Sequence, residues 1–170
     1  MNQAKPTPLM NEEIFEKIYS KVLNFLSYKE RTQQELEAAM DKYLYKIPIS
    51  NSEKAELKSK IFTELGPELA VSDESYAKTY ITDVIQTGRL ISKKQISNFL
   101  YRKGILREVI EDTLEIYYTN EDELRIVQAL CDKRTKNLGL QEKAKMINYL
   151  ISKGFSLSAV YPVVDTKFKR

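Results

Sequence analysis

Residue types that usually perform chemistry are scarce in this chain of 170 residues. It contains no histidine and one cysteine, Cys131, which excludes a Ser-His-Asp or Cys-His nucleophile, a histidine general base, an internal disulfide and a Cys/His zinc site. The five glycines are well separated, so neither a P-loop nor a dinucleotide-binding glycine cluster can form. An enzyme that uses only carboxylates and lysines is one alternative, but we expect a binding protein with no catalytic residue and no cofactor.

The basic residues are the remaining candidates for function, because the net charge of +3 is unevenly distributed. Residues 121–170 hold 10 Lys and Arg against 6 Asp and Glu, whereas residues 1–70 hold 10 against 11. Such a basic end suits contact with nucleic acid or an acidic protein surface, although ordinary solvated lysines account for the charge equally well. Seven cations in two expected helices are the candidate residues for binding a partner or DNA: Lys93, Lys94, Arg102, Lys103, Lys143, Lys145 and Lys153.

Helices must position these cations, because apolar residues recur at spacings of three and four along nearly the whole chain. The first helix is expected to begin near Asn11, a suitable cap, and Thr32 with Glu35 has the spacing of a capping box. Ser92 and Gln95 repeat that spacing, and Gly104 is expected to end the helix that they open. The last helix contains Pro162, which fits if Ser158 is the cap and Pro162 lies near the first turn, and otherwise predicts a kink. Breaks between the expected helices fall near residues 29–31, 46–51, 66–72, 88–91, 104–106, 119–120, 136–140 and 154–156.

An internal repeat organises these helices. A shift of 50 residues aligns three successive helices and includes the Lys103-Gly104 pair, which falls on Lys153-Gly154. The same shift places Ile81 on Cys131, so we expect Cys131 to be a buried structural thiol. The first unit aligns with a shift of 60 and is the most divergent. A period near 50 is typical of stacked helical arrays, in which each unit buries its open face on a neighbour.

The order of short motifs along residues 28–165 resembles the RecX family, bacterial proteins that regulate the RecA recombinase. The matching segments are "RTQQEL" from Arg31, "SDESYAKTYI" from Ser72, "RKGI" from Arg102 and "LISKGFS" from Leu150. The resemblance implies three tandem three-helix units. It also implies a protein that binds the RecA filament and inhibits it in recombination and DNA repair.

We therefore expect an all-α fold, an elongated and slightly curved array of three tandem three-helix repeats with about nine helices. The expected divisions are a flexible N-terminus at 1–10 and repeats at 11–68, 69–119 and 120–170. The expected protein is a cytoplasmic monomer without a membrane span, which binds RecA and makes weak contact with the nucleic-acid backbone. The alternative is a helix-turn-helix transcriptional regulator that reads bases through Gln95, Asn98 and Asn148.

Overall fold

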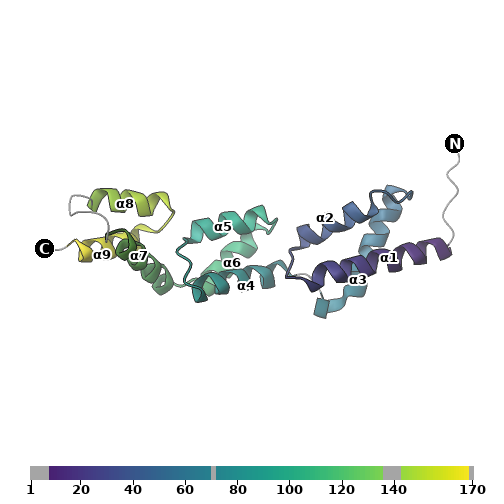
Figure 1. Ribbon diagram of the computed structural model, residues 1–170, viewed down its shortest axis with the longest axis horizontal. Coiled ribbons are helices and arrows are strands. Elements are labelled where there is room, and N and C mark those ends of the chain that lie inside the picture. Colours follow the sequence, from purple (N-terminus) through teal and green to yellow (C-terminus); the bar gives the residue numbers. More distant parts are fainter. Residues whose placement is uncertain (1–7, 70–71, 136–142, 169–170) are drawn as a thin grey trace. The chain divides into compact units, whose positions relative to one another are not determined.

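The computed structural model describes residues 8–69, 72–135 and 143–168, and within these ranges every regular element is a helix (Figure 1). The nine described helices are α1 (Pro8–Ser27), α2 (Gln33–Leu44), α3 (Asn51–Leu69), α4 (Asp73–Gln86), α5 (Lys93–Arg102), α6 (Arg107–Tyr117), α7 (Asn120–Thr135), α8 (Lys143–Ser152) and α9 (Leu157–Lys167). The predicted all-α fold of three-helix repeats is confirmed. The chain forms two compact units, unit 1 (Met1–Tyr76) and unit 2 (Ala77–Arg170). The repeat boundaries at 68/69 and 119/120 stay a prediction.

Unit 1 is held together by apolar side chains from α1, α2 and α3. Its buried core consists of Phe15, Ile18, Val22, Leu36, Met40, Leu44, Ile61 and Leu65. The predicted capping box of α2 is present, because the Thr32 hydroxyl accepts from the Glu35 amide and the Glu35 carboxylate accepts from the Thr32 amide. The expected cap at Asn11 is wrong: α1 begins at Pro8, whose fixed φ suits the first helical position. The predicted break near residue 66 lies at Gly66, which has a φ of 60° within α3.

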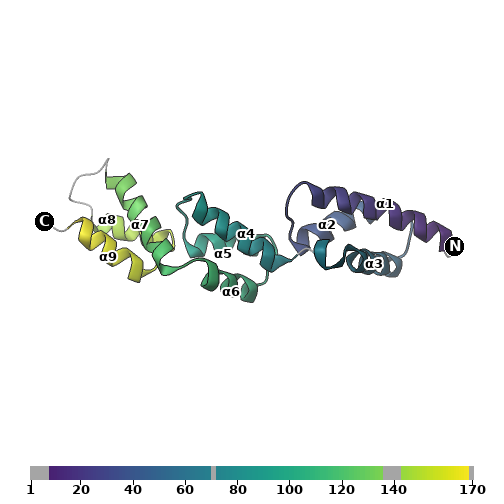
Figure 2. The same cartoon turned by 90° about the horizontal axis from the view of Figure 1, so that it is seen from below.

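Unit 2 contains α5 to α9 and most of α4 (Figure 2). Its buried residues follow the 50-residue repeat. Seven of the position pairs that the shift aligns are buried in both copies. These pairs are Ala77 and Val127, Ile81 and Cys131, Ile96 and Met146, Leu100 and Leu150, Ile105 and Phe155, Ile110 and Val160, and Leu114 and Val164. The repeat therefore specifies the same set of buried positions in both copies.

The helix caps and helix-ending glycines of unit 2 lie where the sequence predicts them, with one exception. Ser92 and Gln95 form a capping box at α5, and Gly104 and Gly154 have φ values of 87° and 88° after α5 and α8. The exception is α9, where Ser156 and not Ser158 is the cap, since its hydroxyl accepts from the Ala159 amide. Pro162 is consequently the sixth residue of α9, inside the helix and not in its first turn. Across the described residues, no helix combines the length and apolarity that a bilayer span requires.

Candidate partner-binding surface

Five of the seven predicted cations lie within helices α5 and α8. The other two directly follow these helices, Lys103 after α5 and Lys153 after α8. Both helices have ten residues and lie along the same side of unit 2 (Figure 1). The two helices are corresponding elements of successive repeats. The cations therefore lie at helix ends, and their grouping depends on which ends meet.

The N-terminus of α5 meets the turn between α8 and α9. The Ser92 hydroxyl donates a 2.6 Å hydrogen bond to the Lys153 carbonyl oxygen. A Cβ atom added at Gly154 would lie 2.7 Å from the Lys94 Cβ, so only glycine allows this approach. We call this contact the α5–α8 junction; it consists of Ser92, Lys94, Lys153 and Gly154. The junction brings Lys94 and Lys153, which are 59 positions apart in the sequence, to one place on the surface.

Three of the seven cations lie over aromatic rings. The Lys103 nitrogen is 5.8 Å from the centre of the Phe99 ring, and the Lys153 nitrogen is 5.7 Å from that of Tyr149. These contacts correspond under the 50-residue shift, so both repeats hold a lysine at the same place. Lys93 lies 5.4 Å from the centre of the Tyr118 ring. A cation over a ring keeps its charge, so these lysines remain able to contact an anionic partner.

Four of the seven predicted cations are not gathered at the junction. Arg102 and Lys103 lie at the opposite end of α5, roughly 14 Å away along a helix of this length. Lys143 and Lys145 are exposed at the start of α8, away from its C-terminal turn. The Lys143 ammonium is 2.8 Å from the Asp165 carboxylate, which offsets its charge locally. The role of all seven residues in binding stays a prediction.

Sequence reasoning missed two arginines on this unit. The Arg134 guanidinium lies 3.8 Å from the centre of the Tyr149 ring, the ring that also contacts Lys153. Arg89 lies over Tyr80, whose ring stacks on Phe99 with 4.3 Å between centres. Arg134 is in α7 and Tyr149 is in α8, so only the packing of these helices reveals the pair. Periodicity along one helix carried no signal for it.

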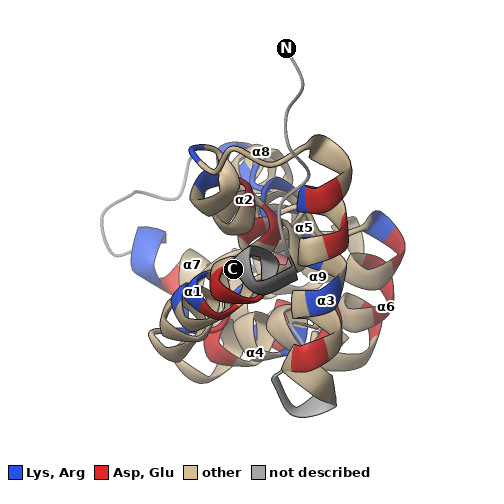
Figure 3. Cartoon of the chain, turned by 90° about the vertical axis from the view of Figure 1, so that its right-hand side faces the viewer, with Lys and Arg blue, Asp and Glu red and all other residues tan. Residues whose placement is uncertain are grey.

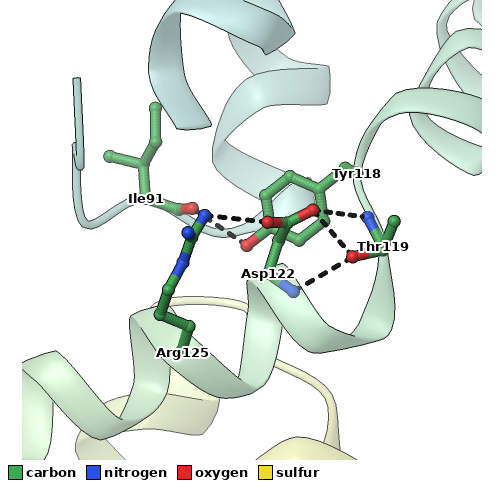
Figure 4. A network of polar contacts seen from close by, with 5 residues as sticks. All are labelled: Ile91, Tyr118, Thr119, Asp122 and Arg125. Atoms are coloured by element: carbon green, nitrogen blue, oxygen red, sulfur yellow. Dashed lines mark hydrogen bonds and ion pairs between the residues drawn. The ribbon is translucent and has the colours of Figure 1, made fainter. Parts of the chain in front are cut away.

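A polar network fixes the loop before α5 against the start of α7 (Figure 4). The buried Tyr118 hydroxyl donates to the Ile91 carbonyl oxygen at 3.2 Å. Asp122 accepts from the Thr119 amide and hydroxyl and pairs with Arg125 at 2.8 Å. Burial, followed by the charges of Glu123 and Asp122, raises the pKa of Tyr118 above its ordinary value. Ser92 directly follows Ile91, so this network helps to position the α5–α8 junction.

A buried carboxylate plays a similar part at α9. Glu123 is 4% exposed and accepts from both the amide and the hydroxyl of Ser156, at 2.9 and 2.8 Å. A carboxylate at a helix N-terminus is stabilised by the amides there, which accounts for its burial. Glu123 thereby holds the start of α9, and with it the turn that carries Lys153 and Gly154.

Acidic and basic residues of unit 2 are concentrated on different helices. Helix α6 presents four exposed carboxylates at helical spacing, Glu108, Glu111, Asp112 and Glu115, which belong to the acidic residues marked red in Figure 3. Three of their four counterparts under the repeat shift, in α9, are uncharged, Ser158, Tyr161 and Pro162, and the fourth is Asp165. The basic residues of α5 and α8 are therefore separate from an acidic helix on the same unit. An anionic surface would be attracted to α5 and α8 and repelled by α6.

The cysteine of this unit is not a reactive group. Cys131 is fully buried, and burial followed by the charge of Asp132 raises the pKa of its thiol. Because the thiolate is the nucleophilic form, this environment suppresses reactivity. The predicted structural role of Cys131 is confirmed.

The fold is an array of helical repeats, and the surface is marked by charged residues. These two features are typical of proteins that bind and regulate other macromolecules.

Comparison with known proteins gives the family. No family model matches the chain. It is 31% identical over 153 residues to regulatory protein RecX of Finegoldia magna, covering 87% of this chain and 70% of that protein. It is 31% identical to regulatory protein RecX of Bacillus cytotoxicus, covering 89% and 54%, and 30% identical to that of Lactococcus lactis subsp. cremoris, covering 86% and 54%. The chain thus spans about half the length of the latter two relatives.

Solved structures agree with this assignment. The crystal structure of RecX from Lactobacillus salivarius superposes with a TM-score of 0.67 at 25% identity, covering 92% of this chain and 97% of the other. A second crystal structure, of regulatory protein RecX, gives a TM-score of 0.71 at 26% identity over 97% and 81%. The chain belongs to the RecX family. The predicted family and the predicted class, a regulatory protein and not an enzyme, are confirmed.

Proposed function

We propose that this protein binds the RecA filament on DNA and inhibits its activity in recombination and DNA repair. The observation that carries the proposal is membership of the RecX family, whose members regulate RecA, over 87% of the chain. We further propose that it acts in the cytoplasm as a monomer, since RecA and DNA are found there and one chain already contains three repeats.

The basic side of unit 2 supports this function. At the α5–α8 junction Lys94 lies against Gly154, the residue after Lys153, and Arg134 shares the Tyr149 ring with Lys153. Exposed lysine and arginine side chains attract phosphates and acidic side chains, and both occur on a protein filament that carries DNA. Contacts with phosphates position a protein without reading bases, which fits weak nucleic-acid contact within a complex made mainly with protein.

The test is RecA ATPase activity on single-stranded DNA with and without this protein. We expect ATP turnover to fall as the protein is added, and labelled protein to co-sediment with the filament. Absence of both effects would contradict the proposal. Tight binding to one duplex sequence that survives moderate salt would instead identify a transcriptional regulator, because sequence readout adds affinity that salt does not remove.

A further inference from the structure

Unit 1 contains a groove that the basic side of unit 2 does not explain. It lies between α1 and α3, has a volume of about 190 Å³ and is floored by apolar side chains that include Ile14, Phe15, Ile49 and Leu57. Ile14, Ile49 and Leu57 are only partly buried, although they pack against the unit 1 core. The unit therefore leaves part of its apolar surface open at this point.

Charged side chains surround this floor with an excess of negative charge. Glu12, Glu53 and Glu56 line the groove together with a single cation, Lys60. Lys60 lies 4.2 Å from the centre of the Phe15 ring and 3.9 Å from a Glu12 oxygen. The Lys60 and Glu12 side chains are 51% and 71% exposed, so this ion pair is weak and an incoming group can replace it. A cation already stacked on the floor shows that the groove accepts positive charge beside apolar surface.

We propose that this groove docks one large apolar side chain flanked by Lys or Arg, presented by the protein component of the partner filament. Size supports a single anchor: a cavity of about 150 Å³ accommodates benzene, whereas sites for drug-sized ligands start near 300 Å³. Charge supports basic flanks, because unit 1 holds 10 Lys and Arg against 13 Asp and Glu, and unit 2 holds 17 against 11. The carboxylates of the groove repel phosphates, so the occupant is a protein segment and not DNA. The assignment of this segment to RecA rests on the proposed function.

Charge reversal within the full chain tests the groove. The double variant Glu12→Lys with Glu56→Lys places two ammonium groups beside Lys60, and the control Glu16→Lys with Glu64→Lys makes the same charge change at exposed positions of the same helices outside the groove. We expect the groove variant to bind RecA filaments at least about tenfold more weakly, and the control to remain within about twofold of the wild type. Equal affinity of the groove variant and the wild type would overturn the proposal and leave the proposed function intact.

A second measurement is independent of RecA. Methyl resonances of Ile14, Ile49 and Leu57 are followed by NMR while the full chain is titrated with the peptide Lys-Lys-Phe-Lys-Lys, and then with Glu-Glu-Phe-Glu-Glu. We expect shifts with the basic peptide alone, and their loss in the groove variant. No shift with the basic peptide would overturn the groove, whereas shifts in a protein that fails to bind RecA would uphold the groove and overturn the proposed function. Self-association that the groove variant abolishes would make a second copy the occupant and overturn the assignment to RecA.

Discussion

At the scale of single residues, Gly154 meets two demands that no other residue type meets together. Its φ of 88° lies in the left-handed region, as does that of its counterpart Gly104 at 87°. It also lies against Lys94, where a Cβ would be 2.7 Å from the Lys94 Cβ and 2.8 Å from its Cδ. Gly88 has a similar φ of 68° but no atom within 4 Å of an added Cβ. A side chain at Gly88 would therefore meet backbone strain alone, whereas one at Gly154 would meet both backbone strain and a clash with Lys94.

Replacing each glycine by alanine measures these two effects within unit 2. We expect Gly88→Ala to lower the free energy of unfolding by about 1 kcal/mol, the cost of a left-handed alanine. Gly154→Ala should lower it by about 2–3 kcal/mol, because the new methyl also displaces Lys94 or opens the α5–α8 junction. Urea unfolding followed by circular dichroism provides both values. Equal losses in the two variants would show that the contact with Lys94 contributes nothing to stability.

At the scale of helices, the cap of α5 connects two repeats. The Ser92 hydroxyl accepts from the Gln95 amide at 3.3 Å and donates to the Lys153 carbonyl oxygen at 2.6 Å. The same hydroxyl therefore acts as acceptor and as donor. Ser50 before α3 accepts from the Glu53 amide at 3.3 Å in the same way, but its hydroxyl donates to the Glu53 carboxylate within its own capping turn. Ser92 therefore caps α5 and also contacts the next repeat. Ser50 caps α3 in the same way but makes no such inter-repeat bond among these contacts, so it serves as the control.

Amide hydrogen exchange distinguishes the two serines. Ser92→Ala should destabilise α5 by about 1 kcal/mol and also speed exchange of the Phe155 amide about tenfold, because the Lys153 carbonyl loses its partner. Ser50→Ala should speed exchange in the first turn of α3 and leave Phe155 unchanged. If Ser92→Ala leaves exchange at Phe155 unchanged, the hydrogen bond between the repeats does not stabilise the α8–α9 turn.

Helices and caps were predictable because their signals lie within a few residues of each other. The capping boxes at Thr32 and Ser92 and the left-handed glycine at 104 all follow from local spacing. The cap of α9 is Ser156 and not Ser158. Two serines two positions apart give the same local signal, and the carboxylate of Glu123 selects Ser156. The pairing of Arg134 with Tyr149 depends on how α7 packs near α8. The 50-residue shift identified core positions but not which ends of α5 and α8 meet.

At the scale of the whole molecule, the two units carry opposite net charge. Unit 1 has 10 basic and 13 acidic residues, a net −3, whereas unit 2 has 17 and 11, a net +6. Exposed charges act over about 8 Å at physiological ionic strength, so a partner in contact with one unit responds mainly to the charge of that unit. Total charge of the chain, +3, therefore describes neither surface. A binding model for this protein must state which unit faces which component of the filament.

Charge reversal on each unit tests whether position or net charge governs binding. The variant Lys94→Glu, Arg134→Glu and Lys153→Glu alters the α5–α8 junction and the cation beside it, and the control Lys17→Glu, Lys42→Glu and Lys46→Glu alters three exposed lysines of unit 1. Lys143 is left unchanged because a glutamate there would face Asp165.

Both variants change the net charge by the same amount, so non-specific repulsion is matched. We expect the junction variant to lose at least about tenfold in filament affinity at moderate salt, and its affinity to depend less steeply on salt concentration than that of the wild type. The unit 1 control should keep the wild-type salt dependence, because its lysines contact no phosphate in this arrangement. Equal losses in the two variants would mean that the filament senses the charge of the whole chain, and that the cations brought together by α5, α7 and α8 do not form a binding site.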